Sequence, residues 1–157
     1  MRSSFLPNAS SNSPSTSPWV EEIARARASI LRQALLAEND TQALYEFFQE
    51  IPESHRRFAW DRVWDRAVIE SWGQNVDYSR VFPLLAWHGS KIVADATLHR
   101  REGGPLRLVG RVKWMLHPGF RGQGLGMLLV NHFIDSARFD GLRHLSCMLI
   151  TDLEADA

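Results

Sequence analysis

A short stretch rich in glycine carries the clearest chemical signal in this sequence. Residues 117–126 read His-Pro-Gly-Phe-Arg-Gly-Gln-Gly-Leu-Gly. Glycine has no Cβ, so a ligand can approach the backbone of such a stretch closely. Where a turn of this kind opens a helix, the first amide N–H groups have no partner within the helix and lie at the positive end of its dipole. That combination suits a phosphate or pyrophosphate group.

Two common phosphate-binding motifs do not fit these glycines. A P-loop requires a lysine directly after its last glycine, and none follows here. The dinucleotide fingerprint Gly-x-Gly-x-x-Gly could begin at Gly122 and Gly124, but its third glycine is replaced by Met127. The pattern that fits is Arg-x-x-Gly-x-Gly, formed by Arg121, Gly124 and Gly126. The remaining alternative is a turn that only reverses the chain and binds nothing.

The elements around the glycines are those that a phosphate site needs. The apolar run Arg111–Leu116 predicts a strand, and Met127–Arg138 has apolar residues at helical spacing. With this strand, the Pro118 that ends it, the loop pattern and the helix, the sequence resembles the GNAT superfamily of acetyl-CoA-dependent N-acyltransferases. The resemblance covers about Ser29 to Ile150, and its specific residues are concentrated in Leu116–Gly126.

The resemblance implies a fold and a function. The fold would be α+β (α/β), a GNAT-like acyl-CoA N-acyltransferase fold with a mixed central sheet, flanking helices and a short C-terminal part. The function would be an N-acetyltransferase that moves an acetyl group from acetyl-CoA, its acyl-donor co-substrate, to a primary amine on a small molecule or a protein lysine. The amine would attack the thioester directly in a ternary complex, where proximity supplies most of the acceleration.

The same resemblance implies where acetyl-CoA would bind. The strand before the loop would part from its parallel neighbour, His144–Ile150, and leave a V-shaped slot for the pantetheine arm. Backbone groups of the strand would pair with that arm, and one N–H would polarise the thioester carbonyl. The loop amides would hold the pyrophosphate. The residues expected to bind acetyl-CoA are Trp114, Met115, Leu116, Arg121, Gly122, Gln123, Gly124, Leu125, Gly126 and Met127.

The sequence leaves the catalytic acid and base undetermined. Many family members use a tyrosine from a later helix as the acid, and Tyr45 and Tyr78 lie too far upstream to match it. Asp95, His99 or Glu102 could act as the base, although each also fits a solvated strand or turn residue. The remaining histidines are expected to be structural or on the surface: His117, His132 and His144.

The rest of the chain is predicted as one domain behind a tail. Residues 1–18, rich in Ser, Asn and Pro, are predicted to be disordered, and residues 19–157 form a single domain. A helix is expected over Trp19–Ala28, with a short strand from Ser29. Further helices are expected from Asn39–Thr41 to near Pro52 and over Asp65–Asn75. The predicted strands are Val81–Trp87, Ile92–Leu98, Leu106–Leu116 and His144–Ile150, with a hairpin turn at residues 88–91 and a helix-ending glycine at Gly141.

Composition excludes several classes of function. Lys and Arg total 18 and are balanced by 18 Asp and Glu, and no basic run suggests a nucleic acid partner. No apolar stretch approaches transmembrane length, and no tight Cys/His cluster suggests a metal. The single cysteine, Cys147, fits a reducing, cytoplasmic location and is expected to be a buried, unreactive thiol.

The end of the sequence raises an alternative function. Residues 151–157 look like the start of a helix, whereas GNAT domains continue with that helix and two more strands. The chain could therefore be a fragment of a larger acetyltransferase, or a non-catalytic acyl-CoA-binding regulatory module. It could also be a shortened domain that covers an exposed sheet edge by forming a homodimer.

Overall fold

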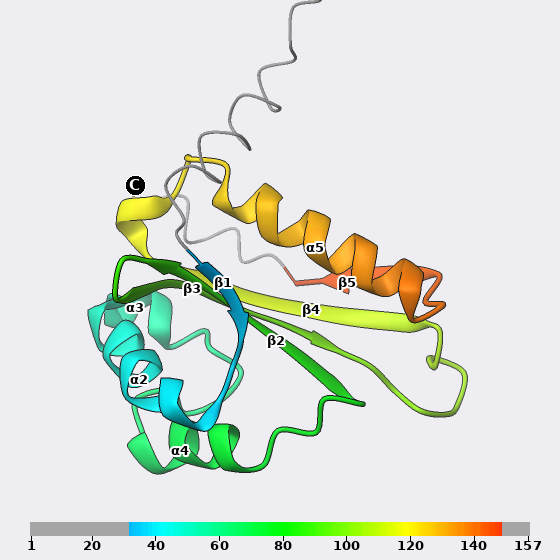
Figure 1. Cartoon of the computed structure of the whole chain (residues 1–157), viewed down its shortest axis with the longest axis horizontal. Helices are drawn as coiled ribbons and strands as arrows, with labels where there is room; N and C mark the ends of the chain where they lie inside the picture. Colours follow the sequence, from blue (N-terminus) through cyan, green and yellow to red (C-terminus); the bar gives the residue numbers. More distant parts are fainter. Residues whose placement is uncertain (1–31, 149–157) are drawn as a thin grey trace, which may run out of the picture.

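The computed structural model describes residues 32–148, with side chains from Leu36 onward, and its centre is one mixed sheet (Figure 1). Five strands follow one another in chain order across this sheet. The first four are antiparallel neighbours, and the last runs parallel to the fourth. The α+β architecture expected from the resemblance is confirmed. The strands are β1 (Arg32–Leu35), β2 (Val81–His88), β3 (Lys91–His99), β4 (Val109–Leu116) and β5 (His144–Cys147).

Helices cover both faces of the sheet (Figure 1). One face carries three helices that come between β1 and β2 in the chain, and the other carries the long helix that follows β4. Short 3-10 turns precede the first and the last of these helices. The helical elements are η1 (Glu38–Asp40), α2 (Thr41–Glu50), α3 (Glu53–Arg56), α4 (Arg66–Gln74), η2 (Pro118–Phe120) and α5 (Leu125–Phe139).

The core under α5 is apolar and closely packed. Ala94, Ala96 and Leu98 of β3 face Leu128 and Phe133 of α5, and all five side chains are fully buried. The helix ends as predicted, because Gly141 adopts a φ of 71° that lets the chain turn back at this point. The amide of the next residue, Leu142, then donates to the carbonyl of Ala137 at 2.8 Å.

The core on the opposite face comes from the two helices predicted between residues 39 and 75, and both are confirmed. Leu44, Phe47 and Phe48 of α2 are buried, as is Ile69 of α4. The carboxylate of Asp65 accepts a hydrogen bond from the amide of Ala67 at 3.0 Å and so caps α4. These helices hold one wall of the cavity described below.

One strand begins later than predicted, and some predicted elements lie outside the described residues. The strand expected from Leu106 begins at Val109, because residues 106–108 form a turn in which the Val109 amide bonds to the Leu106 carbonyl at 3.0 Å. β1 lies within the strand predicted from Ser29. The expected disordered tail at residues 1–18, the helix over Trp19–Ala28 and the end of the last strand lie outside the described residues.

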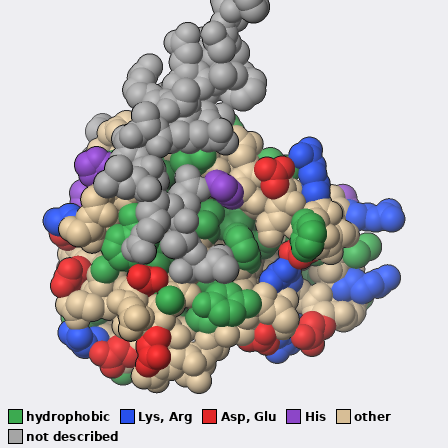
Figure 2. Space-filling model, in the orientation of Figure 1, with side chains coloured by type: hydrophobic (Ala, Val, Ile, Leu, Met, Phe, Trp, Pro, Cys, Tyr) green, Lys and Arg blue, Asp and Glu red, His purple; other side chains and the backbone are tan. Residues whose placement is uncertain are grey.

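The surface agrees with the balanced composition. Figure 2 shows charged side chains of both signs across one face of the molecule. Among the helices of the described residues, none has the length and apolar character needed to cross a bilayer.

Candidate active site

The glycine loop connects β4 to α5 and is braced by its own side chains. Gly122 and Gly124 have φ angles of 68° and 81°, a left-handed conformation that other residues adopt only with strain. The amide of Gly119 donates to Nδ1 of His117 at 3.1 Å, and Nε2 of Gln123 donates to the Gly119 carbonyl at 2.8 Å. The loop therefore has a defined shape without a ligand, and Gln123 contributes to that shape.

Six successive amides follow this braced turn. The Leu128 amide is the first in α5 that bonds within the helix, to the Gly124 carbonyl at 3.0 Å. For the amides of residues 122–127, the described part of the chain supplies no hydrogen-bond acceptor. They lie at the positive end of a 15-residue helix. The arrangement suits an anion, and the assignment of these residues to a pyrophosphate stays a prediction.

The two parallel strands beside the loop are paired over a short region of the described residues. β4 pairs with β5 from Val109, opposite His144, to Val112, opposite Cys147. β4 then continues over residues 113–116 without a partner on that side among the described residues. Within residues 32–148 the pairing of β4 with β5 therefore ends before Lys113, which fits the parting that the resemblance implies.

The register of β4 shows which backbone groups face the parting. The His117 amide donates to the Val93 carbonyl of β3 at 2.9 Å. Backbone groups alternate in direction along a strand, so those of Met115 also face β3, while those of Trp114 and Leu116 face the side of β5. Trp114 and Leu116 can thus offer N–H and C=O groups to a ligand in the slot. Met115 can take part only through its side chain.

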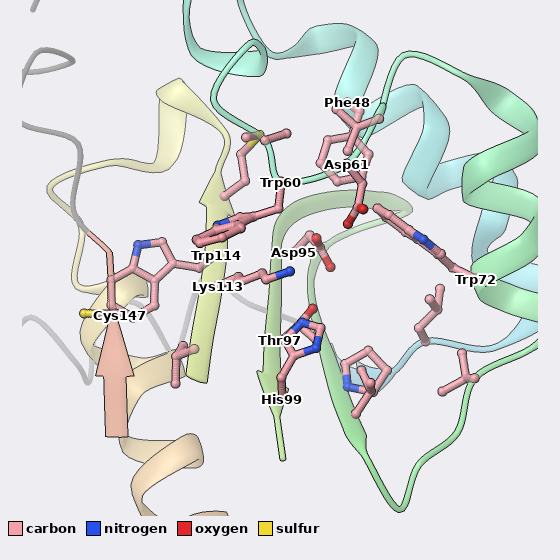
Figure 3. A pocket seen from close by; sticks show the side chains of 18 of the residues that line it. Phe48, Trp60, Asp61, Trp72, Asp95, Thr97, His99, Lys113, Trp114 and Cys147 are labelled. Atoms are coloured by element: carbon pink, nitrogen blue, oxygen red, sulfur yellow. The ribbon is translucent and has the colours of Figure 1, made fainter. Parts of the chain in front are cut away.

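A cavity of about 990 Å³ joins this slot to the space beneath α2 and α4 (Figure 3). Its sheet side is lined by polar side chains of β3 and β4, and its opposite wall carries several aromatic residues among polar and aliphatic ones. At the parting of β4 and β5 the lining continues into apolar residues and Cys147. The polar residues of the sheet side are Asp95, Thr97, His99 and Lys113, and the aromatic residues of the opposite wall include Phe48, Trp60 and Trp72. Trp114 lines the cavity from β4.

Two of the three candidates for the general base lie at the cavity, and the third does not. Asp95 and His99 both line the cavity, whereas Glu102 lies exposed in the turn after β3. Burial raises the pKa of Asp95 to about 7, against the opposing effect of the Lys113 charge. Burial also lowers the pKa of His99, helped by the charges of Lys113 and Arg111 and opposed by the charge of Asp61. Near neutral pH, His99 is uncharged and Asp95 titrates, so both can accept a proton.

The other predicted positions give mixed results. Cys147 was expected to be buried, and this is wrong, because its thiol is exposed on β5, which has one strand neighbour among the described residues. His132 and His144 are exposed, as expected. His117 serves the loop and lies 3.4 Å from a carboxylate oxygen of Glu50.

Neither Trp60 nor Lys113 is among the site residues predicted from the sequence. Trp60 lies in the segment between α3 and α4, and the Lys113 ammonium is 4.8 Å from its ring centroid. The guanidinium carbon of Arg111 is 5.5 Å from the same ring. The available signal was the alternation of polar residues along two otherwise apolar strands, which places residues 95, 97 and 99 on one face with 111 and 113.

Arg121 also has a role that the motif alone did not reveal. Its guanidinium lies 2.9 Å from Nδ1 of His55 in α3, on the far side of the cavity. The side chain thus connects the glycine loop to the helical wall and lines the cavity between them.

Comparisons with known proteins identify the sequence family and the fold of this chain. The sequence model of the acetyltransferase (GNAT) family matches residues 41–156. The GNAT domain of PAT from S. lividans is 16% identical with a TM-score of 0.67, and the match covers 80% of this chain and 75% of that one. A GCN5-related N-acetyltransferase from Kribbella flavida is 21% identical with a TM-score of 0.60, covering 76% and 71%.

A third similar structure was solved with a ligand. A predicted acetyltransferase from Clostridium acetobutylicum, crystallised with acetyl-CoA, is 12% identical with a TM-score of 0.58, and the match covers 76% of this chain and 80% of that one. At these identities the solved structures establish a shared fold, while the family match rests on the sequence itself.

Proposed function

The chain belongs to the GNAT acetyltransferase family, and from this premise we propose that it transfers an acetyl group from acetyl-CoA to a primary amine. The observation that carries the proposal is the parting of β4 from β5 directly beside six amides without acceptors in the described residues. An extended molecule that ends in a diphosphate fits both features. The backbone groups of β4 can pair with its extended part, and the loop amides suit its anionic end.

The residues proposed to hold acetyl-CoA divide by chemistry. Backbone groups of Trp114 and Leu116 would bond to the pantetheine arm, and amides of residues 122–127 would bond to the pyrophosphate. The N–H of Trp114 or Leu116 would also stabilise negative charge on the thioester oxygen. Arg121 adds a cation beside the loop, held by His55.

Asp95 is the proposed general base. It lies opposite Met115, within the parted half of β4, whereas His99 lies opposite Arg111 in the half that still pairs with β5. The acceptor amine would attack the carbonyl carbon of the thioester. A C–N bond forms, the C–S bond breaks, the Asp95 carboxylate takes the amine proton, and the thiolate takes a proton from solvent. A carboxylate whose pKa is about 7 is suited to this role at neutral pH.

A direct test combines binding and turnover. Isothermal titration with acetyl-CoA should show saturable binding, and a thiol-release assay with a panel of primary amines should show turnover. Absence of binding at millimolar acetyl-CoA would remove the proposal.

The helix N-terminus offers a charge-specific test. At Gly126 an added Cβ would meet only Cδ1 of Leu116 at 3.7 Å, an ordinary contact. We therefore expect Gly126→Ala to fold normally, and Gly126→Glu to bind acetyl-CoA on the order of tenfold more weakly than Gly126→Gln, because it adds a negative charge beside the diphosphate. Titration of the three variants measures this, and equal affinity of the Glu and Gln variants would contradict the phosphate assignment.

One observation favours binding without catalysis. Neither described tyrosine is placed to donate a proton at the slot: the Tyr78 hydroxyl donates to the Leu36 carbonyl at 2.6 Å, and the Tyr45 ring lies 5.5 Å from the guanidinium of Arg66. The alternative is an acyl-CoA-binding regulatory module. Saturable acetyl-CoA binding with no thiol release from any amine would favour that alternative, whereas turnover excludes it.

A further inference from the structure

Lys113 brings a positive charge to the sheet side of the cavity, whose lining also contains the carboxylates of Asp61, Asp77 and Asp95. Lys113 is half-buried on β4, directly opposite Thr97 of β3, and its side chain faces the cavity. Its ammonium lies over the Trp60 ring at 4.8 Å. Within the described residues it forms no ion pair or hydrogen bond. An ammonium has three N–H donors, so this one keeps its hydrogen-bonding capacity for another group.

The other cations of the lining are already engaged or lie at its rim. The guanidinium of Arg100 forms an ion pair with Asp140 and donates to the Tyr78 carbonyl. Arg121 bonds to His55. Arg80 is exposed at the rim, close enough to Asp77 to lower the pKa of that carboxyl, although Ser79 is the larger cause. Lys113 is therefore the inward cation of the described lining that can take an anionic partner.

Lys113 and the proposed base lie on the same face of the sheet. Asp95 pairs with Met115 and Lys113 pairs with Thr97, so the two are diagonal neighbours on adjacent strands. Such neighbours are about 7–8 Å apart at Cα, and their side chains can both reach one small molecule. Figure 3 shows the Lys113 ammonium extending over β3 toward Asp95, with Trp60 above it.

Building on the acetyltransferase function proposed above, we propose that the acceptor is an amino-acid-like molecule, a primary amine that also carries an anionic group, and that Lys113 binds that group. The amine would lie at Asp95 and the anion at Lys113. The aromatic wall formed by Phe48, Trp60 and Trp72 would contact an apolar or aromatic side chain of the same molecule. Carboxylates and phosphonates share the required chemistry.

An anionic acceptor should be preferred because the ammonium of Lys113 has only the Trp60 ring as a described partner before the acceptor binds. Contact with an indole face is a weak partner for an ammonium held partly out of water. An anion replaces it with a charge-assisted hydrogen bond, whereas a neutral acceptor of the same shape leaves the ammonium unpaired. We expect this difference to favour the anionic acceptor on the order of tenfold in kcat/KM.

The test compares matched acceptors on the full chain. Thiol release is measured with the common amino acids, with their carboxamides and with 1-amino-2-phenylethylphosphonate, which reports whether a phosphonate replaces the carboxylate. In the unmodified protein, the best carboxylates should exceed their amides about tenfold. In Lys113→Met the ratio should fall to near one, and Lys113→Arg should restore most of it. As a second readout, 3-phenylpropionate should inhibit competitively against the acceptor, and 3-phenylpropionamide should not.

Arg111 provides the control. It contacts the same Trp60 ring from the same strand face but is exposed and outside the cavity lining, so Arg111→Met should keep the ratio. Amides that match or exceed their acids would overturn the inference, as would a Lys113→Met variant that slows both acceptor types equally, which would mean that Lys113 only tunes Asp95. Turnover of neutral amines alone leaves the acetyltransferase function standing without the inference. Absence of all turnover and binding removes both.

Discussion

The two faces of β3 show how one strand can serve two purposes. Ala94, Ala96 and Leu98 point toward α5 and are fully buried in an apolar core. The residues between and after them, Asp95, Thr97 and His99, point into the cavity on the other face. Because side chains alternate along a strand, the packing that fixes the first set also fixes the positions of the second. Rigid positioning of the candidate site is therefore a direct result of the α5 core.

The largest expected effect comes from removing the proposed general base, Asp95, from the cavity face of β3. Asp95→Asn should lower kcat/KM about 10²–10⁴-fold, because the amide cannot accept the amine proton. In the unmodified protein kcat/KM should rise as pH increases through about 7, where Asp95 ionises, and the variant should lose that step. Thiol-release assays between pH 5.5 and 8.5 measure both effects.

Asp61→Asn is the matched control for this experiment. Asp61 lines the same cavity from the segment between α3 and α4 and should affect turnover much less. A loss of only a few-fold in Asp95→Asn would assign the base elsewhere, with His99 as the next candidate.

The next prediction tests the packing between the sheet and α5 and leaves the residues of the cavity unchanged. A Cβ added at Gly110 of β4 would lie 2.7 Å from Cδ1 of Leu98 and 2.9 Å from side-chain carbons of Leu142 and Leu145. Gly110→Ala should therefore lower the free energy of unfolding by about 1–3 kcal/mol. Chemical denaturation measures the change, with Gly103→Ala as control because an added Cβ there meets nothing within 4 Å. Equal stability of the two variants would mean that the α5 face is less tightly packed than it appears.

The smallest expected effect is the loss of folding stability caused by burying the carboxyl of Asp95 on the cavity face. Asp95 has an ordinary pKa of 3.8 when unfolded and about 7 when folded, so its contribution to stability is greatest below pH 3.8 and is lost as pH rises through 7. The difference of about three pKa units between the folded and unfolded states corresponds to at most about 4 kcal/mol of stability. Because Asp95 faces the cavity, screening by solvent should reduce this contribution to about 1–2 kcal/mol. Asp95→Asn should thus be more stable than the unmodified protein at pH 8.

Urea unfolding at pH 5 and pH 8 checks this sign. The advantage of Asp95→Asn should be larger at pH 8, because the folded carboxyl of the unmodified protein is mostly protonated at pH 5. An advantage of the same size at both values would show that the substitution acts through packing rather than through charge.

Local sequence predicted the parts of the molecule that local physics determines. The glycine loop, the hairpin at residues 88–91 and the helix end at Gly141 all depend on backbone conformations that only a few residue types adopt. The pairing of β4 with a parallel β5 followed from the family resemblance. The glycine loop, which forms the proposed pyrophosphate half of the site, thus follows from local sequence, whereas the β4–β5 pairing is a contact between distant segments.

The acceptor side could not be predicted in the same way. The exposure of Cys147 depends on which strand lies at the sheet edge, and the partner of Lys113 is Trp60, which lies 53 positions earlier in the chain. The shifted pKa of Asp95 arises from burial by side chains of several elements. Each of these properties is set by tertiary packing, which periodicity along a single segment does not report.

The half of β4 that has no described partner on one side would link binding in the proposed slot to the stability of the sheet. Over residues 113–116 the sheet lacks a neighbour on one side among the described residues, so an extended molecule lying there would act as a missing strand. By mass action, anything that binds only the folded chain raises its stability as the logarithm of its free concentration. With acetyl-CoA as the proposed ligand, a falling acetyl-CoA concentration would lower the stability of the folded protein as well as the rate of acetylation.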